Sequence, residues 1–129
     1  MPSRLMRKPA EQLMLRIDIQ RNSRTATLYC RGRIVFGMEL ETLRSITMSR
    51  PESVLVIDLA DVETVDASGL GLLVELQHWA VTDGRTLRFT NASEFVARLV
   101  VLTRLYSVLG IFPRQGGESR EQQTAALTA

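Results

Sequence analysis

The side chains with the most capacity for chemistry or regulation are concentrated in one short stretch of the chain. Four carboxylates precede one serine and two glycines: Asp58, Asp61, Glu63, Asp66, Ser68, Gly69 and Gly71. A serine in such a setting can act as a nucleophile, accept a phosphate or cap a helix. Grouped carboxylates can bind a cation or form an acidic surface. Which of these uses is available depends on the elements around the stretch.

A strand and a helix are predicted on either side of this stretch. The run from Val54 to Leu59 is almost entirely aliphatic, which is typical of a central strand covered on both faces. Residues 70–82 predict a helix, because polar residues fall on one stripe and apolar residues elsewhere. The polar stripe is Gly71, Glu75, His78 and Thr82. The inward side chains are Leu72, Leu73, Leu76, Trp79 and Ala80.

Ser68 is therefore expected where a central strand leads through an acidic loop into a helix. In open α/β sheets this edge usually meets ligands and partners. A phosphate on Ser68 would be stabilised by unpaired backbone N–H groups and by the helix dipole. Taken by itself, an N-cap is the commoner explanation of a serine before a helix, and both uses can hold together. Adding roughly −2 of charge beside the four carboxylates would sharpen an acidic surface and repel a partner tuned to the neutral serine.

Other chemistries fit the stretch less well. The Gly-x-Ser-x-Gly pattern of hydrolase nucleophiles lacks its first glycine, and the single histidine, His78, lies on the polar stripe of the same helix. The carboxylates do not follow the spacing of a calcium loop, and no glycine-rich nucleotide-binding pattern occurs. We therefore expect no catalytic residue, no metal and no cofactor, with His78 solvated at the surface.

The remaining elements predict a small α/β domain. Residues 13–19 and 25–34 form an antiparallel pair, with Gly32 at a bend or bulge. Residues 38–48 have helical spacing, and 86–90 form a short strand. Asn91 or Ser93 can cap a helix that runs to about Thr103, and Leu105 to Phe112 closes the domain.

The crossover between residues 54 and 90 implies a parallel pair of strands in a mixed sheet of about four to five strands with helices packed on it. The predicted organisation is a single domain over residues 13–112. A flexible arm at 1–12 and a flexible tail at 113–129 flank it.

Composition limits the class of protein. The 129 residues are 45% hydrophobic, which suits one packed core. Residues 1–34 hold eight basic and two acidic groups, whereas residues 35–83 hold two and nine. The basic groups are scattered through an arm and strands, so no nucleic-acid partner is expected. No run approaches the roughly 18 to 20 apolar residues that cross a bilayer, and no signal peptide is recognisable, so we expect a cytoplasmic protein without membrane insertion.

Four residues have two readings each. Cys30 lies in an apolar run and is expected to be a buried, inert thiol rather than a nucleophile. Trp79 has the helical spacing of a core residue, although an exposed tryptophan would indicate an interface. Gly69 and Gly71 leave the first helical turn uncovered, which either lets a partner approach closely or relaxes the chain at the start of the helix.

Two segments together resemble the signature of the STAS domain family, the anti-sigma factor antagonists and their relatives. They are the strand Val54 to Leu59 and the run Val65-Asp66-Ala67-Ser68-Gly69-Leu70-Gly71, and the similarity extends over about residues 14–112. The resemblance implies that Ser68 is phosphorylated by a kinase that is also the anti-sigma factor, with Asp66 in a supporting role. It also implies that only the unphosphorylated form binds this partner.

The chain departs from the family pattern at one place. Family members often carry a Gly-x-Leu-Asp pattern, and here the run is Gly32-Arg33-Ile34-Val35, without the acidic residue. In family members that side chain is expected near the phosphorylatable serine, so the departure bears on kinase recognition more than on the fold. An alternative function stays open: a non-phosphorylated scaffold or binding subunit, such as a stressosome component or the partner of a lipid-transport ATPase.

The predicted function is that of a bacterial regulatory domain that performs no chemistry itself. It binds an anti-sigma factor with serine kinase activity, controls transcription through it, and is switched off when Ser68 is phosphorylated. The predicted partner-binding residues are Asp61, Glu63, Asp66, Ala67, Ser68, Gly69 and Gly71. No oligomeric state is predicted.

Overall fold

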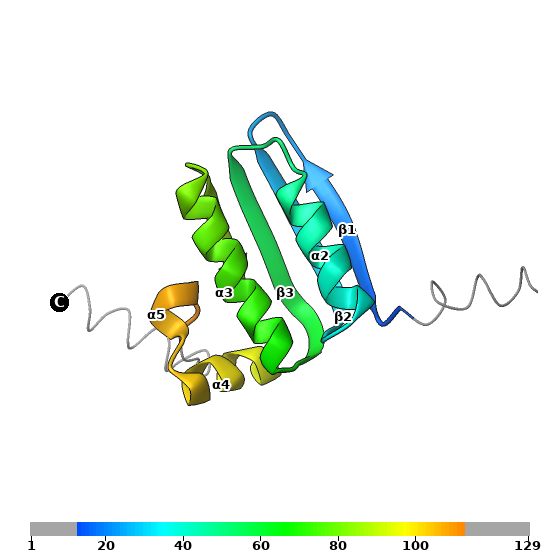
Figure 1. Cartoon of the computed structure of the whole chain (residues 1–129), viewed down its shortest axis with the longest axis vertical. Helices are drawn as coiled ribbons and strands as arrows, with labels where there is room; N and C mark the ends of the chain where they lie inside the picture. The colour runs from blue at the N-terminus through cyan, green and yellow to red at the C-terminus, as the bar shows by residue number, and fades with distance from the viewer. Residues whose placement is uncertain (1–12, 113–129) are drawn as a thin grey trace, which may run out of the picture.

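Four strands and four helices occur in residues 13–112, the part of the chain that the computed structural model describes (Figure 1). The strands are β1 (Leu15–Arg21), β2 (Thr25–Ile34), β3 (Val54–Val65) and β4 (Thr86–Thr90). The helices are α2 (Met38–Met48), α3 (Ala67–Thr82), α4 (Glu94–Thr103) and α5 (Tyr106–Leu109). The predicted arm at 1–12 and tail at 113–129 lie outside the described residues.

The strands form one mixed sheet in the order β1-β2-β3-β4. β1 and β2 pair antiparallel across a short turn in which the Asn22 side chain accepts the N–H groups of Arg24 and Thr25. β2 and β3 are parallel, and so are β3 and β4. Parallel neighbours need a crossover, and α2 and α3 supply the two crossovers. The prediction of an α/β domain with a mixed sheet of about four strands is confirmed.

Helices α2 and α3 cover one face of the sheet and build the core against it (Figure 1). Alternate strand residues such as Leu28 and Ile57 are completely buried in this core. On the other face Val54 and Val56 are only half-buried. The prediction that β3 is covered on both faces is therefore wrong for the described residues. Val56 is paired with a threonine of β2 and an arginine of β4, so sheet neighbours rather than a helix half cover it.

The predicted faces of α3 are confirmed. The polar stripe is exposed throughout, namely Gly71, Glu75, His78 and Thr82. The buried positions are Leu72, Leu73, Leu76 and Ala80, and Trp79 is partly buried with the guanidinium of Arg85 5.3 Å from its ring centre. In the described part of the chain, no helix combines the length and the apolar character needed to cross a bilayer.

Strand β3 is longer than its aliphatic run, because it continues to Val65. The acidic stretch therefore belongs to a strand, and the prediction of an acidic loop before Ser68 is wrong. Between Tyr29 and Arg33 of β2 the register shifts twice, and each time β3 carries one extra residue. Gly32 lies within this irregular region at φ +116°, where a Cβ would lie 2.1 Å from the carbonyl oxygen of Met14. The prediction of a bend or bulge at Gly32 is confirmed to the extent that the register is irregular there, although the extra residues lie on β3 and not on the strand of Gly32.

Candidate functional site

Ser68 lies in the first turn of α3, at the end of the sheet where β2 and β3 finish (Figure 1). It is the second residue of the helix, which begins three residues earlier than the residue 70 that the sequence pattern predicts. Its side chain is exposed, and within residues 13–112 its Oγ atom takes part in no side-chain hydrogen bond. The interpretation of Ser68 as the N-cap is therefore wrong. The hydroxyl is free for another use.

The N-cap of α3 is Asp66. Its Oδ1 accepts a hydrogen bond from the Gly69 N–H at 2.7 Å, and its Oδ2 accepts one from the Phe36 N–H at 3.0 Å. One carboxylate thus ties the start of α3 to the segment that follows β2. Burial by itself would raise the pKa of Asp66, but these backbone donors outweigh it and hold the pKa below its ordinary value.

The two glycines of the first turn have different surroundings. A Cβ at Gly69 would lie 2.0 Å from the carbonyl oxygen of Ile34 at the end of β2, so this glycine allows the helix to pack closely on the sheet. Gly69 is buried and presents little surface to a partner. Gly71 is exposed, and nothing lies within 4 Å of a Cβ built there. The internal packing of the domain gives no reason for a glycine at position 71.

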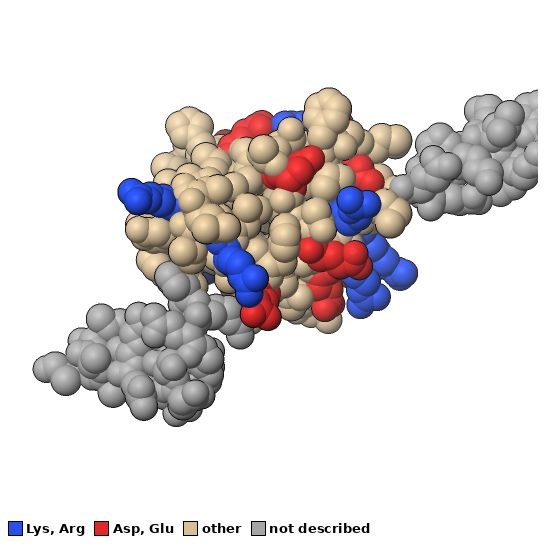
Figure 2. Space-filling view, turned by 90° about the horizontal axis from the view of Figure 1, so that it is seen from below, with Lys and Arg blue, Asp and Glu red and all other residues tan. Residues whose placement is uncertain are grey.

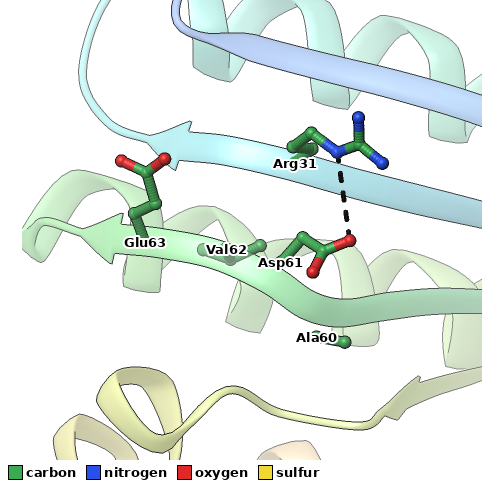
Figure 3. Close-up of a pocket in the computed structure, with 5 residues that line it drawn as sticks. All are labelled: Arg31, Ala60, Asp61, Val62 and Glu63. Atoms are coloured by element: carbon green, nitrogen blue, oxygen red, sulfur yellow. Dashed lines mark ion pairs between the residues drawn. The ribbon is translucent and has the colours of Figure 1, made fainter.

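The carboxylates of the acidic stretch do not gather around Ser68. Asp61 is paired across the sheet with Arg31, and the guanidinium lies 3.9 Å from its carboxylate (Figure 3). Asp61 and Glu63 line an open hollow of about 430 Å³ together with Arg31, Ala60 and Val62 (Figure 3). Arg31 shares its side of β2 with exposed Tyr29, the side opposite the buried core residues. Asp61 therefore lies on the face of the sheet that α3 does not cover.

Asp58 has an internal role in β3. It is buried, its Oδ1 accepts the N–H of Ala60 at 3.0 Å, and its Oδ2 accepts a hydrogen bond from the side-chain amide of Asn91 at 2.7 Å. Asn91 adopts φ 55°, so Asp58 also holds the turn that follows β4.

Ser93 rather than Asn91 caps α4. Ala67, the first residue of α3, is exposed beside Ser68.

The end of the domain that carries Ser68 is mostly uncharged. Figure 2 looks onto this end and shows uncharged side chains over most of it, with the acidic groups in separate clusters, several of them beside basic groups. Among the described residues, the acidic surface expected around Ser68 is therefore not present as one continuous patch. A phosphate on Ser68 would add charge where there is little, rather than reinforce an existing field.

Two exposed apolar side chains at this end of the domain were not predicted from the sequence. Phe36 is 78% exposed and Met38 is 56% exposed, although both are large and apolar. The backbone of Phe36 is held against the start of α3 by Asp66. Half-buried Val35 precedes them, so this segment carries no acidic side chain between Ile34 and Met38. A usable signal was present for Met38 alone, which falls outside the helical period that buries Leu40 and Leu43, whereas Phe36 precedes α2 and has the spacing of that buried stripe.

The other chemical candidates are not placed to react. Cys30 is 2% exposed, and burial first, with the nearby Asp58 carboxylate second, raises the pKa of its thiol to about 12. His78 is exposed on the outer stripe of α3, two turns and more beyond Ser68. Within residues 13–112, no three side chains of the metal-binding types come together. What the site offers is an exposed hydroxyl on a rigid helix start beside exposed apolar groups.

Comparison with known proteins agrees with this fold. A family model described as the STAS domain matches residues 16–116. Among solved structures, Mglu matches at 21% identity with a TM-score of 0.55, over 60% of this chain and 20% of that chain. An anti-sigma factor antagonist from Mycobacterium paratuberculosis matches at 19% identity with a TM-score of 0.64, over 78% of this chain and 86% of that chain.

The anti-sigma factor antagonist SpoIIAA is also similar. In its unphosphorylated form it matches at 11% identity with a TM-score of 0.60, over 86% of this chain and 97% of that chain. The phosphorylated form of SpoIIAA from Bacillus matches at 14% identity with a TM-score of 0.59, over 85% of this chain and 99% of that chain. At these identities the likeness concerns the fold. The chain spans about a fifth of the length of Mglu and nearly the whole of SpoIIAA.

Proposed function

This chain belongs to the STAS domain family, and on that premise we propose that it is a protein-docking regulatory domain of the anti-sigma factor antagonist type. It performs no chemistry itself. Its partner is a cytoplasmic anti-sigma factor that is also a serine kinase. The unmodified domain binds this protein and so influences transcription, and phosphorylation of Ser68 releases it.

The observation that carries the proposal is the free, exposed hydroxyl of Ser68 in the first turn of α3. Because Asp66 caps the helix, the fold does not use the Ser68 hydroxyl, and a kinase can modify it without breaking a structural bond. A phosphate there would lie near the positive end of the helix dipole, which stabilises it. It would bring roughly −2 of charge to a mostly uncharged surface, and a partner that buries this turn would then have to desolvate that charge, which weakens binding.

The similar structures support the proposal. SpoIIAA, an antagonist of this fold, has been solved both unphosphorylated and phosphorylated, and this chain resembles the two forms about equally, at TM-scores of 0.60 and 0.59. SpoIIAA therefore carries a phosphate in one of the two forms that this chain resembles. We expect the phosphorylated form of this chain to keep its fold and to differ mainly in the charge of its docking surface.

One observation favours a second candidate function. Val35 and exposed Phe36 occupy the segment in which family members often carry an acidic residue near the serine. If a kinase requires that carboxylate, Ser68 stays unmodified and the domain is a constitutive scaffold or binding subunit, such as a stressosome component or the partner of a lipid-transport ATPase. The two functions differ in whether Ser68 is ever modified.

The test is phosphorylation with purified components. The protein is incubated with ATP and each purified anti-sigma factor kinase of its source organism, and the modified residue is mapped by mass spectrometry. Ser68→Ala is the negative variant. Ser107 supplies a matched control, because it is also an exposed serine at the second position of a helix, α5.

The proposal expects modification of Ser68 in the wild type, none in Ser68→Ala, and unchanged modification in Ser107→Ala. It also expects Ser68→Asp to bind the kinase more weakly than Ser107→Asp does. Modification confined to other residues, or equal binding by the two aspartate variants, would refute the switch. Tight binding of a partner without any modification of Ser68 would favour the scaffold instead.

A further inference from the structure

We propose that the partner docks on the face formed by α2 and α3, with Phe36 and Met38 as its apolar anchors, and that it presents an apolar pocket with a basic rim. The inference rests on the proposed function and specifies which surface of the domain is used. It moves the docking surface away from Asp61 and Glu63, which line the hollow at the other face of the sheet.

Phe36 and Met38 are exposed to solvent, although most large apolar side chains of the domain are buried in its core. At 78% exposure, Phe36 is the most exposed of the large hydrophobic side chains in the described residues, and Met38 follows two residues later at the start of α2. Aromatic residues and methionine are the types enriched at the centres of protein interfaces. Exposed apolar groups beside a modifiable residue mark an interaction site more specifically than scattered ones do.

The backbone that carries these anchors is fixed in place. Asp66 accepts the Phe36 N–H at 3.0 Å, and the next residue, Gly37, adopts φ +119°, a conformation that favours glycine. Glu39 in the first turn of α2 accepts the N–H of Met14 at 2.9 Å. Anchors presented on a held segment lose little conformational freedom on binding. Through Asp66 the same segment is tied to the turn that carries Ser68.

Gly71 gives a second, independent observation on this face. It belongs to the exposed stripe of α3 that begins at Ser68, and its open surroundings mean that alanine would fit without a clash. A glycine within a helix destabilises it relative to alanine, so position 71 is suboptimal for the fold alone. Close approach of a partner to the backbone of the first turn accounts for the missing side chain.

The charged side chains on α2 and α3 indicate what kind of protein binds at this face. Arg44 of α2 is shared by two carboxylates, at 2.8 Å from Glu41 and 2.9 Å from Glu75 of α3. The side chains of Glu41 and Glu75 are 75% and 46% exposed, against 31% for Arg44. Glu41, Arg44 and Glu75 form the rim of the docking face, and two carboxylates against one guanidinium make this rim net acidic. It complements a basic rim on a different protein, whereas a second copy of this chain would bring the same carboxylates face to face.

Binding of the purified kinase that modifies Ser68 tests the inference, with affinities measured by isothermal titration calorimetry. The variants are Phe36→Ser, Met38→Ser and Gly71→Ala. Val81→Ser is the matched control, because Val81 is 69% exposed and lies in the last turn of α3, at the far end of the helix from Ser68. Thermal melts of each variant establish that the fold is intact.

We expect Phe36→Ser to weaken binding at least about tenfold, as loss of an interface anchor does, while Val81→Ser stays within about twofold. Gly71→Ala should weaken binding although its melting temperature is no lower than that of the wild type.

If the wild type binds and all three variants bind equally well, the inference is wrong and the proposed function stands. If no kinase binds the wild type, both are refuted. If the wild type sediments as a dimer in the absence of the kinase and Phe36→Ser sediments as a monomer, the face binds a second copy of this chain and the inference is also overturned.

Discussion

Replacing Asp66 by alanine is expected to lower the free energy of unfolding by about 2 kcal/mol. The carboxylate makes two hydrogen bonds that alanine cannot replace, from the Gly69 N–H at 2.7 Å and from the Phe36 N–H at 3.0 Å. Loss of an N-cap costs roughly 1 kcal/mol. Loss of the second bond, which lies nearer the surface, adds roughly 0.5 to 1 kcal/mol.

Two further variants separate these contributions. Asp66→Ser keeps a capping oxygen for the helix but cannot also reach the N–H of Phe36, so it should recover about half of the loss. Ser68→Ala removes a hydroxyl that no bond uses, so its effect should stay within about 0.5 kcal/mol. If Ser68 rather than Asp66 were the cap, the order of the two alanine variants would be reversed.

Urea denaturation followed by far-UV circular dichroism measures these differences, provided that the m-value is the same in all variants. The expected order of stability is wild type and Ser68→Ala together, then Asp66→Ser, then Asp66→Ala. An Asp66→Ala protein as stable as the wild type, or a Ser68→Ala protein as unstable as Asp66→Ala, would refute the assignment of the cap.

The same carboxylate predicts a pH dependence. Although burial opposes it, the backbone donors lower the pKa of Asp66 from its ordinary value of 3.8. A carboxyl with a lowered pKa in the folded state stabilises the protein above its unfolded pKa, and this contribution is lost as the pH falls through the folded pKa. The stability difference between wild type and Asp66→Asn should be constant above about pH 5 and shrink below about pH 4. A difference that grows on acidification would contradict the lowered pKa.

Three other substitutions or probes test the packing of the domain, one of them at the site. Gly69→Ala should destabilise by roughly 1 to 3 kcal/mol in urea denaturation, because its Cβ would lie 2.0 Å from the Ile34 carbonyl oxygen. Thr47→Val should stabilise by about 1 kcal/mol, because the completely buried Oγ1 of Thr47 has no hydrogen-bond partner among the described residues; a loss of stability would imply a bond to that hydroxyl. Cys30 should not react with a thiol reagent at pH 8 until the protein is unfolded, because its thiol is buried with a pKa raised to about 12; rapid labelling of the native protein would show that the strand opens.

The elements could be predicted where apolar periodicity was clean. The helix expected at residues 38–48 has those bounds, because Leu40 and Leu43 set a helical stripe. The parallel pairing of β3 with β4 follows from the crossover that α3 must make. Ser93 was one of two caps proposed for α4, and its side chain does accept the N–H of Val96, at 3.3 Å.

The details of the site could not be predicted, because they depend on contacts between distant segments. Asp66 and Ser68 are both good N-cap residues, and what distinguishes them is the hydrogen bond that Asp66 accepts from the N–H of Phe36, thirty residues earlier in the chain. The acidic residues at 61 and 63 favoured a loop, because charged residues are depleted in strands, yet two register shifts let β3 continue through them. Exposure of Phe36 could not be inferred from its apolar type.

The most direct test of the central claim is the affinity of one kinase for two forms of the same protein. The wild type is phosphorylated at Ser68, separated by ion exchange from the unmodified form, and each is titrated with the kinase in a buffer containing ADP. The account predicts that the unmodified form binds and that the phosphorylated form binds at least about tenfold more weakly, with its fold retained by circular dichroism. Equal affinity of the two folded forms would contradict it.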